Sequence, residues 1–132
     1  MILIRIGSAV EVILENRDEQ CSNRTPLGER KLLSPMLAGQ LSGLFKVLSN
    51  DTRLRLLHEL VRRGEACVSD ISTALGMSSQ AVSNQLQRLN DWRILSSRRE
   101  GNNIIYKIIN PCVPELLERA LCFVEADHEE EK

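Results

Sequence analysis

The chain has 132 residues, of which 42% are hydrophobic and 27% charged, and its net charge is -1. This length suits one domain, the composition is typical of a soluble globular protein, and no apolar run reaches the ~20 residues of a membrane helix. Arg5 and Glu11 interrupt the apolar start MILIRIGSAVEVIL, and no signal-cleavage pattern follows. We therefore expect a cytoplasmic protein with no membrane segment.

Three segments are expected along the chain. Residues 1–34 are predicted to form a partly flexible N-terminal extension, because Pro26 and Gly28 break its polar second half. The folded domain is predicted over residues 35–127, and an acidic tail over residues 128–132.

Two amphipathic helices are predicted at the start of the domain. The first begins at Pro35 after the N-cap Ser34, and its apolar stripe is Leu37, Leu41, Leu44, Phe45 and Leu48. The second, DTRLRLLHELVRRG, has Asn50 as its N-cap and stops at Gly64. We expect it to bury Leu54, Leu57, Leu60 and Val61, and to leave Arg53 and Arg55 facing solvent for phosphate.

Two further helices are predicted, a short one in the stretch CVSDISTALG and a longer one in the stretch MSSQAVSNQLQRLND. Gly76, Met77 and Ser78 form the turn between Leu75 and Ser79, which is the spacing of a helix-turn-helix. The longer helix has an outer face that is polar but barely charged. Its short amides and hydroxyls suit the base edges of a DNA major groove, although an ordinary solvated helix is the alternative. These candidate DNA-contacting residues are Ser79, Gln80, Ser83, Asn84 and Arg88.

The next residues, ILSSRREGNNIIYKII, alternate in character on both sides of a turn and predict two paired strands. We call this hairpin, residues 94–109, the wing. Its basic and amide side chains suit the phosphate backbone or a minor groove: Arg98, Arg99, Asn102 and Asn103. A basic hairpin directly after a helix-turn-helix favours DNA binding over an ordinary surface hairpin.

The last helix is predicted over roughly residues 113–127. Its apolar surface is wide enough for a partner helix as well as for its own domain, and it comprises Leu116, Leu117, Ala120, Leu121, Phe123 and Val124. Residues 78–109 carry five basic and two acidic side chains, whereas residues 110–132 carry two basic and seven acidic ones. DNA is therefore expected to meet the first of these segments.

The order of these elements resembles the ArsR/SmtB family of winged-helix bacterial repressors, and so do the strings SNDTRLRLLHEL, EACVSDIS, MSSQAVSNQLQRL and RREGNNIIYKI. The fold implied is mainly α with a β-hairpin, a homodimeric winged helix-turn-helix. The resemblance also implies dimerisation through the first and last helices, binding to a double-stranded inverted-repeat operator, and release by a metal, metalloid or other signal. The helix and wing residues named above match the family's DNA-contacting positions, except that Asn84 replaces a common His.

Many members carry Glu-Leu-Cys-Val-Cys-Asp where this chain has Glu65-Ala66-Cys67-Val68-Ser69-Asp70. Ser69 replaces the second thiol, which argues against a three-thiolate arsenic site within this motif. Similarity to the zinc- and cadmium-sensing members implies a mixed site in which Cys67 and Asp70 join Cys21 of the other subunit's extension. The ion would be thiol-binding, of the zinc, cadmium, lead or arsenic type. At the family's other common metal site this chain has Asn110, Cys112, Phe123 and Ala126, so that site is expected to be absent.

Three alternatives remain open at this stage. Cys67 at a helix N-terminus favours thiolate, which would help oxidation as much as metal binding. The switch could therefore be oxidation of Cys67, Cys112 or Cys122, or there could be no switch. A protein-interaction module is a further alternative. An enzyme is not expected, because no nucleophile–base pair, phosphate loop or carboxylate cluster is evident.

Overall fold

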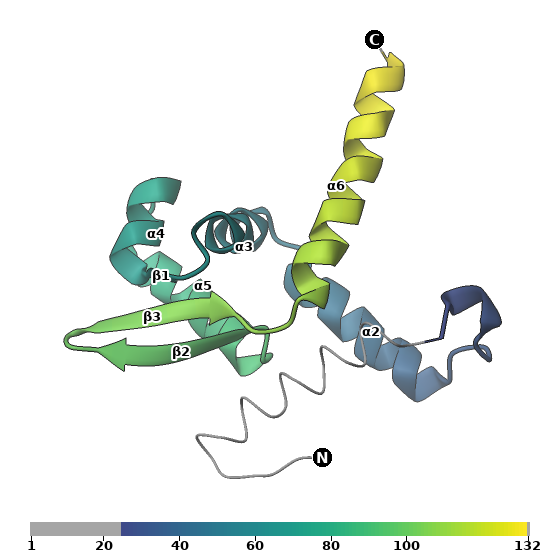
Figure 1. Ribbon diagram of the computed structural model, residues 1–132, viewed down its shortest axis with the longest axis horizontal. Coiled ribbons are helices and arrows are strands. Elements are labelled where there is room, and N and C mark those ends of the chain that lie inside the picture. Colours follow the sequence, from purple (N-terminus) through teal and green to yellow (C-terminus); the bar gives the residue numbers. More distant parts are fainter. Residues whose placement is uncertain (1–24, 132) are drawn as a thin grey trace.

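The computed structural model describes residues 25–131, and Figure 1 shows how their elements are arranged. The elements in chain order are η1 (Leu27–Glu29), α2 (Pro35–Leu48), α3 (Asp51–Arg63), β1 (Ala66–Cys67), α4 (Val68–Leu75), α5 (Ser79–Asp91), β2 (Leu95–Glu100), β3 (Asn103–Ile108) and α6 (Cys112–Glu131). Helices dominate, and a β-hairpin follows the α4–α5 helix-turn-helix. The predicted winged arrangement is confirmed.

Side-chain caps set the starts of three helices, at Ser34 and Asn50 as predicted and also at Ser78. The Ser34 hydroxyl accepts a hydrogen bond from the Leu37 N–H, the Asn50 amide oxygen accepts one from the Arg53 N–H, and the Ser78 hydroxyl accepts one from the Ala81 N–H. Each satisfies a backbone donor that the first turn of a helix leaves unpaired. At the other end, Gly64 and Gly76 adopt positive φ at the C-caps of α3 and α4.

The core lies where α3, α4 and α5 meet. Its fully buried side chains are Leu56, Leu57, Leu60, Ile71, Val82, Leu86 and Leu89. The prediction that α3 buries Leu54 and Val61 is wrong, since these side chains are 38% and 45% exposed. The buried stripe of α3 is centred on Leu56, Leu57 and Leu60, and the two exposed residues lie together at its edge.

The sheet has one strand more than the sequence predicted. The strand order is β1-β3-β2 and both pairs are antiparallel. The wing strands pair with the expected turn, but Ala66 and Cys67, predicted as the approach to and start of a helix, form β1 against the outer edge of β3. A strand of two residues is too short to show an alternation of apolar and polar side chains in the sequence. It can be recognised only from its pairing with the edge of β3 in the folded chain.

Two helices keep apolar side chains exposed. On α2, Leu37, Leu41 and Phe45 are 38%, 42% and 48% exposed, although Leu48 is buried in the core. The helix α6 projects away from the sheet and the other helices in Figure 1. It continues to Glu131, beyond the predicted end at residue 127, into the segment predicted as an acidic tail. No helix among residues 25–131 is long and apolar enough to cross a membrane.

Candidate nucleic-acid interface

The outer face of α5 presents the polar residues that the sequence singled out. Ser79, Gln80, Asn84 and Arg88 are exposed, whereas Ser83 is half-buried. The opposite face is anchored because Val82, Leu86 and Leu89 are fully buried. The Gln80 Nε2 donates a hydrogen bond of 3.0 Å to the Asn84 Oδ1, so the two amides lie along the same side of the helix. A rigid helix thus carries a row of neutral hydrogen-bonding groups.

The position of α5 is also set by Arg53 of α3. Its Nε donates to the Gln85 Oε1 at 2.7 Å, and its Nη1 donates to the Val47 carbonyl at 2.8 Å. Arg53 is half-buried in this contact. The prediction of a solvent-facing phosphate ligand at Arg53 is therefore wrong: the guanidinium joins α3 to α5 and to the end of α2. Arg55 remains exposed.

The wing places its predicted residues in two different environments. Arg99, Asn102 and Asn103 are exposed around the turn, and the Arg99 Nε lies 3.4 Å from the Gly101 carbonyl oxygen. Arg98 is also exposed, but it forms ion pairs with Glu65 at 2.8 Å and Glu100 at 2.6 Å. Hydrogen bonds to Glu65 and then Glu100 raise the pKa of Arg98 above its usual value. The Arg98 charge is thus already matched by carboxylates of the same chain.

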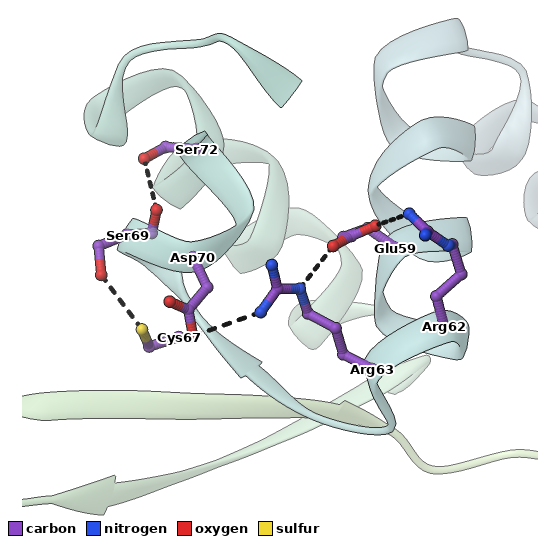
Figure 2. Close-up of polar contacts among 7 residues, drawn as sticks. All are labelled: Glu59, Arg62, Arg63, Cys67, Ser69, Asp70 and Ser72. Carbon is purple, nitrogen blue, oxygen red and sulfur yellow. Dashed lines mark hydrogen bonds and ion pairs between the residues drawn. The ribbon is translucent and has the colours of Figure 1, made fainter. Parts of the chain in front are cut away.

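The segment around Cys67 is shown in Figure 2. Cys67 is half-buried as the N-cap of α4, and its Sγ lies 3.2 Å from the Ser69 Oγ. Asp70, in the first turn of α4, is 51% exposed, and its Oδ2 lies 3.9 Å from the Arg63 Nη1. Both candidate ligands therefore lie at the start of α4, close to a guanidinium from the end of α3.

Arg63 is held in place by the buried carboxylate of Glu59, as Figure 2 also shows. Glu59 is only 8% exposed and also accepts a hydrogen bond from Arg62 at 2.9 Å. The hydrogen bond from Arg63, followed by the charges of both arginines, holds the pKa of Glu59 below its usual value against the opposing effect of burial. This pairing allows a carboxylate to lie in a mostly apolar helix interface.

The described residues do not by themselves form a complete metal site. Among them, no group of three or more His, Cys, Asp or Glu side chains lies close enough together to hold an ion. Cys67 offers a thiol and Asp70 a carboxylate, a donor set that fits a thiol-binding ion but needs further ligands. Cys21, the third predicted ligand, lies outside the described residues, as does the rest of the extension before residue 25. At the family's other site, Phe123 and Ala126 are exposed on α6 and offer no donor group.

Sequence reasoning missed the residues that connect these surfaces. Glu65 was noted only as part of a motif, and the pairs Arg98–Glu65 and Arg53–Gln85 join residues 33 and 32 positions apart. Helical or strand periodicity relates only near neighbours, so it cannot indicate such pairs. One signal was available for the buried pair: Glu59 and Arg63 are four residues apart on a helix, a spacing that supports ion pairs.

Comparison with known proteins agrees with this architecture. Residues 50–97 match the family described as "Bacterial regulatory protein, arsR family". The chain is 34% identical over 85 residues to the cadmium resistance transcriptional regulatory protein CadC of Listeria innocua, covering 64% of this chain and 71% of the relative. The solved structure of the AntR antimony-specific transcriptional repressor has 54% identity and a TM-score of 0.72, covering 81% of this chain and 97% of that one. A homodimeric winged helix-turn-helix domain from Mycobacterium bovis has 35% identity and a TM-score of 0.60, covering 74% and 88%.

Proposed function

Because this chain belongs to the arsR family of bacterial regulatory proteins, we propose that it represses transcription as a dimer bound to an inverted-repeat operator. The related proteins are regulators and not enzymes. We further propose that a thiol-binding metal or metalloid near Cys67 releases the operator, and that the protein acts in the cytoplasm.

The exposed amide and hydroxyl face of α5 is the observation that carries the DNA-binding proposal. A helix fits the major groove, where an Asn or Gln side chain can pair bidentately with adenine. Gln80 and Asn84 occupy adjacent turns of that face and are held in line by their mutual hydrogen bond. Arg88 at the end of α5 and Arg99, Asn102 and Asn103 of the wing then reach phosphates or the neighbouring minor groove.

Dimerisation is proposed through α2 and α6. Phe45 on α2 and Leu121 and Phe123 on α6 are 48%, 52% and 70% exposed, so each helix presents apolar surface that its own domain does not cover. A two-fold dimer would present two α5 helices to major-groove segments about 34 Å apart. An inverted-repeat operator is the DNA symmetry that matches such a dimer.

The effector is proposed to be a soft ion, because Cys67 supplies sulfur and soft ions favour thiolate ligands. Relatives are named for resistance to cadmium and for specificity for antimony. In this chain Cys67 and Asp70 would contribute two ligands, with Cys21 of the other subunit as a third. To release the operator, the ion needs only to bind more tightly to the dimer conformation that binds DNA weakly. The coupling free energy between ion binding and DNA binding is typically about 1–3 kcal/mol.

The proposal is tested by measuring operator affinity while ions are added. Fluorescence anisotropy on labelled operator, selected from random duplex DNA, would follow titrations with Sb(III), As(III), Pb(II), Cd(II) and Zn(II). We expect at least one ion to weaken binding by roughly 5- to 150-fold. Cys67→Ser and Cys21→Ser should each abolish that loss, whereas Cys122→Ser on exposed α6 serves as the matched thiol control and should keep it.

Two other results would contradict parts of this proposal. Release by mild oxidation with no effect of any ion would make the protein a redox switch and remove the metal assignment. Affinity for DNA that does not change with salt concentration would remove the phosphate contacts assigned to Arg88 and the wing, because such contacts release counterions.

A further inference from the structure

Cys67 and Arg98 lie in one row across the outer face of the sheet. Cys67 on β1 is paired with Ile105 of β3, and Arg98 on β2 is paired with the same Ile105. Residues directly opposite each other in antiparallel strands project to the same face. The other face carries Ala66 and Tyr106, which are buried in the core. The predicted ligand residue and a wing arginine therefore share the outer face, one strand apart on each side of β3.

Arg98 is tied to the Cys67 segment by a bidentate ion pair. Its Nη1 and Nη2 each donate to one carboxylate oxygen of Glu65 at 2.8 Å. Its Nε and Nη2 donate to the Glu100 Oε2 at 2.9 and 2.6 Å. Glu65 and Glu100 together occupy the Nε, Nη1 and Nη2 donors of Arg98, which leaves its guanidinium less available to a DNA phosphate.

We propose that Glu65 and Arg98 form a brace that connects the Cys67 strand to the wing, and that Arg98 positions the wing and does not contact phosphate. The brace deepens the function proposed above and rests on it. Because β1 has only two residues, its backbone pairing with β3 is a short attachment, and the bidentate pair is a second one. Glu65 is two residues from Cys67, so a ligand that displaces β1 displaces the anchor of Arg98. An exposed ion pair contributes little to stability, so the effect of the brace is on geometry.

The first test compares the salt dependence of operator binding for wild type, Arg98→Gln and Arg99→Gln. A lost phosphate contact lowers the slope of log K against log salt by ~0.9 for each subunit. We expect this drop for Arg99→Gln and an unchanged slope for Arg98→Gln. A drop for Arg98→Gln of ~0.9 for each subunit would overturn the brace, whatever the result for Arg99.

The second test asks whether the pair carries the ligand response. Glu65→Gln and Arg98→Gln should each lose most of the ion-induced fall in operator affinity, whereas Glu100→Gln should keep it, because Glu100 lies within the wing itself. The charge-swapped double variant Glu65→Arg with Arg98→Glu should regain the response. Circular dichroism checks that each variant is folded.

The possible failures of this test are distinct. A normal ion response in folded Glu65→Gln, or no recovery in the folded charge-swapped variant, would overturn coupling through the brace. If wild type responds to no ion, the proposed sensing fails, and the salt comparison still decides whether Arg98 is a positioning residue.

Discussion

At the scale of single residues, Glu59 is connected to the Cys67 segment through Arg63, which pairs with Glu59 and faces Asp70. It is a buried carboxylate whose charge is matched by Arg62 and Arg63, and Arg63 in turn faces Asp70 across the α3–α4 junction. The orientation of Arg63 beside Asp70 thus depends on a residue in the core. The predicted ligand pair lies at the edge of this network, and Glu59 has no direct contact with either ligand.

Acid sensitivity should follow from the lowered pKa values of Glu59 and Glu65. A carboxyl group whose pKa is lower in the folded state contributes stability that is complete above its ordinary value of about 4.3 and is lost as the pH falls through the lower folded value. We expect the free energy of unfolding to decline over this acidic range. Urea unfolding between about pH 6 and about pH 2 measures it.

Glu59→Gln should flatten this acid decline, because glutamine does not titrate. Glu118→Gln, on the exposed surface of α6, is the matched control and should leave the decline as in wild type. An acid decline in Glu59→Gln equal to that of wild type would show that Glu59 is not its source.

At the scale of elements, the recognition helix α5 depends on contacts at its start and along its length. Ser78 caps its first turn, its apolar face is buried, and Arg53 holds Gln85 from the side. Cys67 is the N-cap of α4, and Ile71 of α4 packs in the same buried core as the apolar face of α5. Under the coupling proposed above, a change at Cys67 would reach α5 through this packing and the wing through β1.

Removing the cap of α5 should have a cost that depends on the substitution. Ser78→Ala loses the hydroxyl acceptor and should reduce the free energy of unfolding by about 1 kcal/mol, whereas Ser78→Gly should cost only a few tenths because glycine is tolerated at this position. Chemical denaturation of both variants measures the difference. An unchanged free energy of unfolding in Ser78→Ala would mean that the Ser78–Ala81 hydrogen bond does not stabilise α5.

At the scale of the whole molecule, the exposed apolar surfaces of α2 and α6 are the features from which we infer a second subunit. Val113 at the base of α6 is buried in the core and Leu116 and Leu117 pack against it, while Leu121, Phe123 and Val124 farther along the helix remain exposed. The helix therefore changes from domain packing to open surface along its length. A dimer would cover this surface and bring two DNA-binding units into a fixed relation.

A charge in the exposed apolar face of α6 should separate the subunits. We expect Leu121→Glu to give folded monomers in analytical ultracentrifugation, because a charged side chain would lie unpaired in the interface. Arg119→Glu, about 160° around the helix, places the same residue type on the polar side and should leave a dimer. A stable dimer of Leu121→Glu would locate the interface elsewhere.

What the sequence determined by itself is the local structure. The caps Ser34 and Asn50, the terminating glycines Gly64 and Gly76, and the turn of the wing were all predicted correctly. The polar face of α5 was also predicted, since helical spacing assigns neighbouring residues to faces. All of these depend on interactions within a few residues, which periodicity and propensity encode.

What only the tertiary structure decided is how distant segments meet. The pairing of Cys67 with Ile105, the bidentate contact of Glu65 with Arg98 and the link from Arg53 to Gln85 join residues more than 30 positions apart. Each depends on how the core packs α3, α4 and α5 and on where the wing folds back to give β1 an edge. The physical reason is that such contacts depend on the packing of the whole core, whereas the periodicity of apolar and polar residues relates only near neighbours in the sequence.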